Sequence, residues 1–213
     1  MRGDAPEDRR RPPARPVDED SRPEERENFR AGLGLDRAWR DLCQLRDDGL
    51  LEPVDLGVGG EGIDSPEQAR ALAREVRGFL GVGDDPLGAM ADVAAGLGLW
   101  CRTTTARIDG LSLTPQPGLG VAVIGEALKP CRRRATAAHE IGHHVAGDAY
   151  EASGHYAAPR EAGGGRIDAF AAELLLPRAV VERLRNPSRD EQRVTPRRAS
   201  ELTLGVLSGG ESR

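Results

Sequence analysis

The sequence predicts an α+β fold, in which a small antiparallel sheet of about three strands packs with helices. Three observations lead to this expectation. Apolar residues recur at helical spacing between about residues 65 and 97, they alternate or run together as in strands between 98 and 126, and helical spacing returns near Arg132. The strands are short and separated by turn residues, which favours hairpin-like pairing over a large parallel sheet.

Composition limits the class of protein before any motif is considered. The chain has 213 residues, 38% apolar and 31% charged, and its 30 basic and 35 acidic residues give a net charge of −5. Because binding to nucleic acid normally needs a basic surface, and aromatic residues make up only 3%, direct nucleic-acid binding is not expected. No apolar run is long enough to span a bilayer, so no membrane partner is expected either.

The cysteines and the first residues of the chain bear on localisation. Cys43, Cys101 and Cys131 are odd in number, far apart and without a CxxC pair, so we interpret them as free thiols in a reducing compartment. The first residues are charged and lack an apolar segment, unlike a secretory signal. A cytoplasmic location is therefore expected.

The region before residue 65 divides into two parts. Residues 1–30 contain eight arginines, nine acidic residues and five prolines, and we expect this charged tail to be disordered. Residues 31–64 are predicted to hold a short helix over 36–48, with Leu35, Trp39 and Leu42 on one face, followed by a glycine-rich linker over 49–63.

Residues 65–186 are predicted to form the main domain. Ser65 and Pro66 have the N-cap and first-turn pattern of a helix, and Asp85 with Pro86 repeats that signal. Strands are expected over 99–101, 108–114 and 119–124. A helix follows from about Arg132, then a loop from Gly147 to about 165, and further helices over 166–176 and 177–185. We expect residues 187–213 to hold a C-terminal helix, starting at 195, and a loose tail.

One motif in this domain carries chemistry: His139-Glu140-Ile141-Gly142-His143, an HExxH sequence. The two histidines are one helical turn apart, so both imidazoles can hold one metal ion, and zinc accepts such nitrogen ligands. Glu140 lies about 100° round the helix, where it can take a proton from the attacking water and pass it to the leaving amine. His144 lies a further 100° beyond His143, and we expect it to face solvent.

The segment after the loop extends the pattern. It reads Ile167-Asp168-Ala169-Phe170-Ala171-Ala172-Glu173-Leu174-Leu175-Leu176-Pro177. This FAAELLLP ending, together with HExxH and the preceding Arg132-Arg133-Arg134, resembles the ImmA/IrrE family of bacterial metallopeptidases over roughly residues 66–186. The resemblance implies a minimal zincin-type peptidase fold of the gluzincin kind.

The third zinc ligand is where this chain departs from that family. The resemblance implies a glutamate four residues before Asp168, but Gly164 stands there. The three glycines 163–165 look like an insertion, which makes Glu161 the displaced ligand. Asp168 is the alternative, and a site of two histidines completed by water or substrate stays open. Glu173, about 180° round the helix, is expected to be a surface acid.

The function that these features imply is zinc-dependent peptide-bond hydrolysis in the cytoplasm, with zinc held by His139, His143 and Glu161. By resemblance, the substrate is a separate helix-turn-helix repressor in stress or mobile-element regulation, so this chain takes part in transcription regulation through the protein that it cuts. The alternative is a catalytically weak zincin-like module that acts as a binding partner or sensor. The oligomeric state is not predicted.

Overall fold

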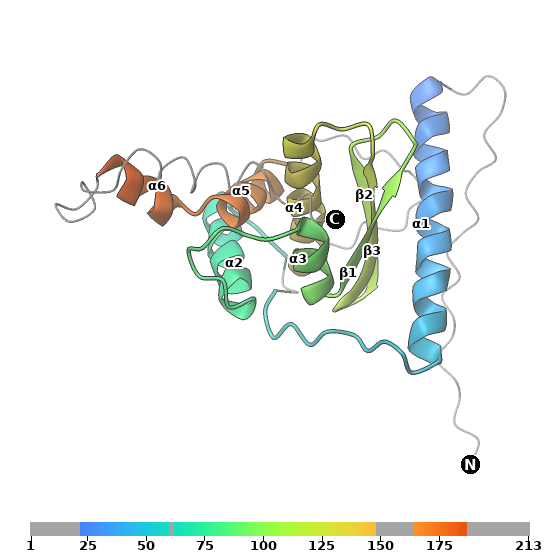
Figure 1. Cartoon of the computed structure of the whole chain (residues 1–213), viewed down its shortest axis with the longest axis horizontal. Helices are drawn as coiled ribbons and strands as arrows, with labels where there is room; N and C mark the ends of the chain where they lie inside the picture. Colours follow the sequence, from blue (N-terminus) through green and yellow to red (C-terminus); the bar gives the residue numbers. More distant parts are fainter. Residues whose placement is uncertain (1–21, 60–61, 148–163, 187–213) are drawn as a thin grey trace, which may run out of the picture.

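The computed structural model describes residues 22–59, 62–147 and 164–186, and it has an α+β fold. Four layers follow one another in Figure 1: helix α1, the sheet, the pair α3 and α4, and the pair α2 and α5, with α6 at the far end. The elements are α1 (Pro23–Asp47), α2 (Pro66–Phe79), α3 (Met90–Gly96), β1 (Leu99–Thr104), β2 (Gly110–Gln116), β3 (Leu119–Gly125), α4 (Pro130–Ala146), α5 (Gly164–Leu175) and α6 (Arg178–Arg185).

The sheet has three strands, as predicted, but its strand directions are mixed. Its order is β1-β3-β2, and β2 pairs antiparallel with β3, with Leu111 opposite Val123. β1 instead pairs parallel with β3, from Leu99 beside Gly120 to Thr104 beside Gly125. The expectation of a wholly antiparallel sheet is therefore wrong for β1. All seven residues of β3 are buried, which suits the central position in the sheet. Because β1 pairs along one side of β3 and β2 along the other, β3 has no unpaired edge.

Helix α1 covers one face of the sheet and is longer than the sequence suggested. It begins at Pro23, with Glu24 and Glu25 in its first turn, where proline and acidic side chains are favoured. Residues 23–30 are therefore helical rather than part of a disordered tail, while residues 1–21 lie outside the described part. A separate apolar core joins α1 to the sheet and includes Leu35, Leu42, Val121 and Val123.

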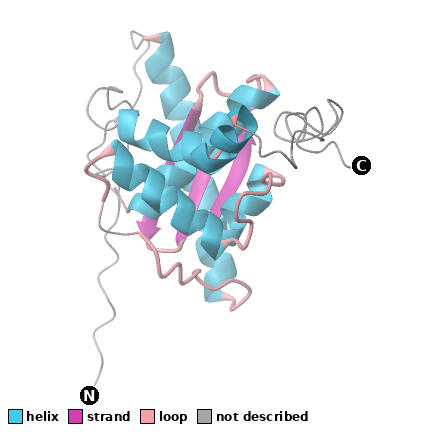
Figure 2. Ribbon diagram, turned by 90° about the vertical axis from the view of Figure 1, so that its left-hand side faces the viewer, coloured by secondary structure: helices cyan, strands magenta, loops and turns pink. Residues whose placement is uncertain are grey.

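The opposite face of the sheet carries α3 and α4, with α2 and α5 packed behind them (Figure 2). Helix α2 starts as predicted, with the Ser65 hydroxyl accepting from the Gln68 amide at 3.2 Å in a capping box. Helix α3 starts at Met90, later than the Asp85-Pro86 signal indicated. The intervening backbone is held by other contacts, because the Asp85, Leu87 and Gly88 carbonyls accept from arginine side chains.

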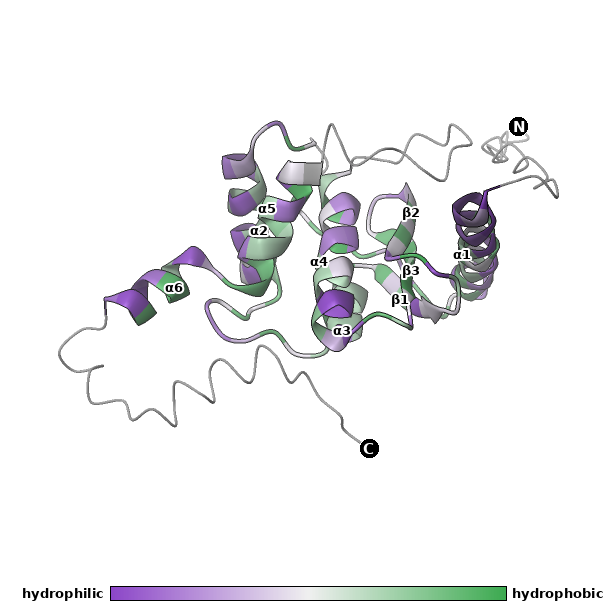
Figure 3. Cartoon of the chain, turned by 90° about the horizontal axis from the view of Figure 1, so that it is seen from above, coloured by the Kyte–Doolittle hydropathy of each residue, from purple (hydrophilic) through white to green (hydrophobic). Residues whose placement is uncertain are grey.

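Most of the ribbon of α1 has the colour of hydrophilic residues in Figure 3. No helix among the described residues is long and apolar enough to cross a membrane. None of the three cysteines forms a disulfide, as predicted. The helix expected from residue 195 lies outside the described residues.

Candidate metal centre

Helix α4 carries the HExxH motif and packs directly against the sheet. The sheet residues beneath it are small, and two of them are glycines. A Cβ atom on Gly110 would come within 2.8 Å of Glu140 Oε1, and one on Gly120 within 2.9 Å of His144 Nδ1. Because neither position has room for a side chain, glycine at both lets the helix approach the strands. Gly147 then ends α4 in the left-handed conformation, at φ 65°, where the loop was predicted to begin.

The two motif histidines face one another across one turn of α4. Their Nε2 atoms are 3.2 Å apart, and the ring centroids are 4.9 Å apart. Two nitrogens bonded to one tetrahedral zinc ion at roughly 2.0–2.1 Å would lie about 3.3 Å apart. The spacing of His139 and His143 therefore fits a shared zinc ion.

Asp168 supports the first of these histidines from α5. Its Oδ1 atom lies 2.9 Å from His139 Nδ1, the ring nitrogen on the opposite side from the one that faces His143. Metal-binding histidines commonly donate their second N–H to a carboxylate in this way, which fixes the tautomer and the ring orientation. The geometry thus gives Asp168 the position of an orienting residue rather than that of a third ligand.

The described residues do not gather a set of three metal ligands. In residues 22–59, 62–147 and 164–186, no group of three histidine, cysteine or acidic side chains is gathered as a metal site. Glu161, the residue predicted from the sequence, lies outside these ranges. Gly164 is the first residue of α5, so the described helix begins just after the segment that contains Glu161.

Glu140 is the acid of the motif, and it faces the sheet beside the two histidines. Its side chain is only 6% exposed, and the Ser112 hydroxyl of β2 donates to Oε2 at 2.6 Å. A hydrogen bond to a buried carboxylate is among the stronger ones in proteins and fixes its position. This hydrogen bond thus holds the carboxylate in one orientation, on the same turn of α4 as His139.

His144 does not face solvent, so that expectation is wrong. The residue is 3% exposed, with Nε2 at 2.7 Å from the Leu97 carbonyl and Nδ1 at 2.9 Å from the Thr114 hydroxyl. Since a carbonyl can only accept, Nε2 carries the proton and Nδ1 accepts from Thr114. Burial lowers the pKa of His144, against the smaller opposing effect of the Leu97 hydrogen bond. His144 therefore attaches α4 to the sheet.

Glu173 is also buried rather than a surface acid. It is 3% exposed and lies in α5, which packs against α2. Its carboxylate pairs with Arg74 of α2 at 3.4 Å and accepts from the backbone amide of Arg178, at the start of α6, at 3.4 Å. Glu173 thus connects α5 with α2 and α6, because α2 covers the side of α5 that was expected to face solvent.

Sequence reasoning missed Gly110, Ser112 and Thr114, which touch Glu140 and His144 from β2. A signal was present, because small or polar residues alternate with Leu111 and Leu113 along this strand. Such an alternation gives the strand one face of small and polar side chains. The alternation predicts this face of the strand, but it does not show that helix α4 packs on it.

The geometry of the site agrees with a comparison of the whole sequence with known families. The model of the IrrE N-terminal-like domain, Peptidase_M78, matches residues 100–206. The chain belongs to this peptidase family. No curated protein and no solved structure matched the chain. The match starts in β1, so α1, α2 and α3 lie before the part that the family model covers.

Membership of a metallopeptidase family and the placement of the HExxH residues support a metallopeptidase-like function for the chain. They also agree with the resemblance to ImmA/IrrE proteins that the sequence motifs indicated.

Proposed function

We propose that this protein is a zinc-dependent endopeptidase. His139 and His143 would hold the zinc ion, with Glu161 as the third ligand. When bound, zinc acts as a Lewis acid that polarises the scissile carbonyl and makes water a better nucleophile. The observation that carries the proposal is the 3.2 Å separation of the two Nε2 atoms, with Asp168 on the far nitrogen of His139.

Glu140 supplies the proton transfer. Its carboxylate accepts a proton from the attacking water and returns it to the leaving amine nitrogen, so the peptide bond is replaced by a carboxylate and a free amine. Ser112 holds one carboxylate oxygen, which leaves the other to receive the proton. Asp168 keeps the His139 ring in place during the reaction.

A protein substrate suits the sheet beside the site. Among the described strands, β2 lies at the edge of the sheet, paired with β3, and it carries Ser112 next to Glu140. An extended peptide can add to such an edge through main-chain hydrogen bonds, which brings its backbone close to the catalytic carboxylate. The family resemblance supports a separate helix-turn-helix repressor as that substrate, in the cytoplasm, in stress or mobile-element regulation.

The test is cleavage of candidate regulators, co-expressed with wild type or with Glu140→Gln, alongside measurement of bound zinc. We expect both proteins to hold one zinc ion per chain and the variant to cut at least about a hundredfold more slowly, because the proton carrier is lost. Glu75→Gln, which alters an exposed residue of α2, is the matched control and should cut like wild type. Equal cleavage by Glu140→Gln would exclude this mechanism.

The second candidate is a zincin-like binding or sensor module. It is favoured by the glycine at position 164, where the family pattern has a ligand. Zinc-loaded wild-type protein that binds a regulator without cutting it would support this function over the peptidase.

A further inference from the structure

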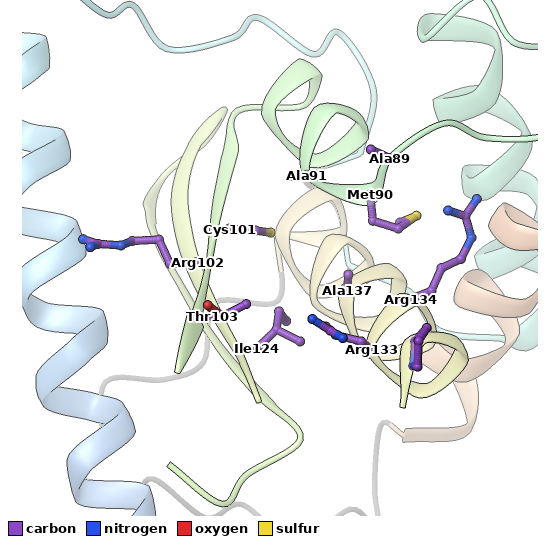
Figure 4. Close-up of a pocket in the computed structure, with 11 residues that line it drawn as sticks. Ala89, Met90, Ala91, Cys101, Arg102, Thr103, Ile124, Arg133, Arg134 and Ala137 are labelled. Carbon is purple, nitrogen blue, oxygen red and sulfur yellow. The ribbon is translucent and has the colours of Figure 1, made fainter. Parts of the chain in front are cut away.

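A cavity of about 330 Å³ lies beside the metal helix, between α3, the edge strand β1 and the first turns of α4 (Figure 4). Ala137 is one of the residues of α4 that line it. Since successive residues of an α-helix are about 100° apart, Ala137 and His139 point in nearly opposite directions. The cavity is therefore on the far side of α4 from the two motif histidines.

The walls of this cavity combine apolar side chains with unbalanced positive charge. Met90, Ile124 and Ala137 are the main apolar residues, and three arginines (102, 133 and 134) but no carboxylate complete the described lining. Arg102 turns away, toward Asp41 of α1, with which it pairs at 3.3 Å (Figure 4). The other two arginines remain on the α4 side of the cavity.

Arg134 is fixed in place without an acidic partner. It donates to the Leu87 and Gly88 carbonyls, each at 2.8 Å, and its Nε atom is buried without a hydrogen-bond partner. Burial lowers the pKa of Arg134, and no carboxylate opposes this effect. Its guanidinium thus adds a fixed positive charge at the cavity wall.

Arg133 is the arginine of the cavity whose guanidinium can bind an anionic ligand. It makes no hydrogen bond or ion pair with its side chain among the described residues, and in Figure 4 its guanidinium extends from α4 toward Ile124 and Thr103. A guanidinium offers a planar set of donors that matches a carboxylate or a phosphate. Thr103 lines the cavity across from it, and the nearby N-terminus of α4 adds the positive end of a helix dipole.

The remaining polar group in the cavity is neutral. Burial, together with the charge of Glu140, raises the pKa of the Cys101 thiol to about 12, so this side chain stays protonated at neutral pH. It does not cancel the positive charge of the arginines, and it is not a reactive thiolate. Cys101 therefore acts as one more weakly polar wall.

We propose that this cavity binds a small organic anion, whose apolar body packs against Met90, Ile124 and Ala137 while its carboxylate or phosphate group binds Arg133. The volume is at the lower end of the range of small-molecule sites, and such sites combine apolar walls with a few placed polar groups. The proposal stands apart from the peptidase function, because none of the residues named in it belongs to the metal centre.

In the experiment, the whole 213-residue chain is loaded with zinc and titrated with 1-anilinonaphthalene-8-sulfonate, and the fluorescence of this sulfonate reports binding. Octanoate, octyl phosphate and the neutral octanol serve as competitors. We expect saturable binding to one site and displacement by at least one of the two anions, but not by octanol at the same concentration. Which anion displaces the probe better distinguishes a carboxylate ligand from a phosphate ligand.

Three variants locate the site. Arg133→Gln should weaken binding about tenfold, the effect of losing one charge-assisted hydrogen bond. Arg132→Gln removes the same charge from the neighbouring residue, which pairs with Asp109 and does not line the cavity, and it should bind within about twofold of wild type. Ala91→Phe fills the rim from α3 and should abolish binding while leaving every arginine in place.

Several results would overturn the proposal. These are no saturable binding by the wild type, displacement by octanol as efficient as displacement by the anions, or wild-type affinity in either Arg133→Gln or Ala91→Phe. If Arg133→Gln does not fold, Ala91→Phe alone decides, because it leaves the metal helix unchanged.

Discussion

The two sides of helix α4 that flank Glu140 differ in how tightly they are held. Toward the sheet, His144 is 3% exposed and bonded at both ring nitrogens. Toward α5, the side chain of His139 is 26% exposed, and its partner Asp168 is 72% exposed. One side of the helix is thus fixed by buried hydrogen bonds, while the other carries a more exposed histidine and its carboxylate partner. A rigid back that supports an accessible reaction site is a common requirement for precise catalytic geometry.

The largest effect that separates the two sides should be on stability. His144→Ala leaves the Leu97 carbonyl and the Thr114 hydroxyl without their buried partner and opens a cavity, so it should lower the free energy of unfolding by roughly 2–4 kcal/mol. His139→Ala, measured without metal, should cost less than about 1 kcal/mol because its hydrogen bond with Asp168 is partly exposed to solvent. Urea unfolding in the presence of a chelator measures both. Equal losses would remove the distinction between the sides.

Substitutions on the side of α4 that faces α5 should change the affinity for metal rather than the stability. Asp168→Ala removes the carboxylate that orients His139, and we expect zinc affinity to fall about 10- to 100-fold with little change in the stability of the metal-free protein. Competition with a chromogenic chelator gives the affinity. Glu161→Ala is the comparison, because a direct ligand should matter more than an orienting residue. If Asp168→Ala lowers zinc affinity more than Glu161→Ala does, Asp168 rather than Glu161 is the third ligand.

Glu140 lies between the two sides, and its support from β2 can be tested separately. Ser112→Ala removes the hydroxyl that donates to its carboxylate, and we expect kcat to fall about tenfold while zinc content stays unchanged. Ser112→Thr, which keeps the hydroxyl, should retain more activity than the alanine variant. A Ser112→Ala enzyme with unchanged kcat would show that the hydrogen bond does not position the carboxylate for proton transfer.

The smallest effect concerns pH. The pKa of His144 is lowered in the folded protein, whereas in the unfolded chain it has the ordinary value of 6.5. Below pH 6.5 the unfolded chain therefore binds a proton that the folded protein does not. The stability that this group contributes is thus present above that pH and is lost as the pH falls below it. Between about pH 7.5 and about pH 5.5 the wild type should therefore lose about 1 kcal/mol more stability than His144→Gln does. Urea unfolding without metal at both pH values measures this. The same loss in both proteins would mean that other groups cause it.

Local patterns in the sequence predicted where helices begin and end, but contacts between residues far apart in the sequence were not predicted. The start of α2 at Ser65, the helical placement of His139 and His143, and the end of α4 at Gly147 all depend on residues a few positions apart. The burial of His144 depends on Leu97 and Thr114, which are 47 and 30 residues away, and the burial of Glu173 depends on Arg74, which is 99 residues away. No spacing within one helix reveals such partners.

The parallel pairing of β1 and the length of α1 were missed for a related reason. Turn residues between strands show where a strand ends, but they do not show which edge of β3 the first strand takes. For α1, the eight residues 23–30 look like a charged tail when they are considered alone. They become helical in continuity with a segment whose apolar face is buried on the sheet.

The position of α1 has a practical consequence for expression. A fragment trimmed to the part that matches the peptidase family would start at residue 100 and lack this helix. Leu111, Val121 and Val123 would then present an uncovered apolar face to water. Such a fragment should aggregate or be degraded even though it contains both motif histidines and Glu140. Truncations intended for crystallisation should therefore begin before Pro23, where the helix that protects this face starts.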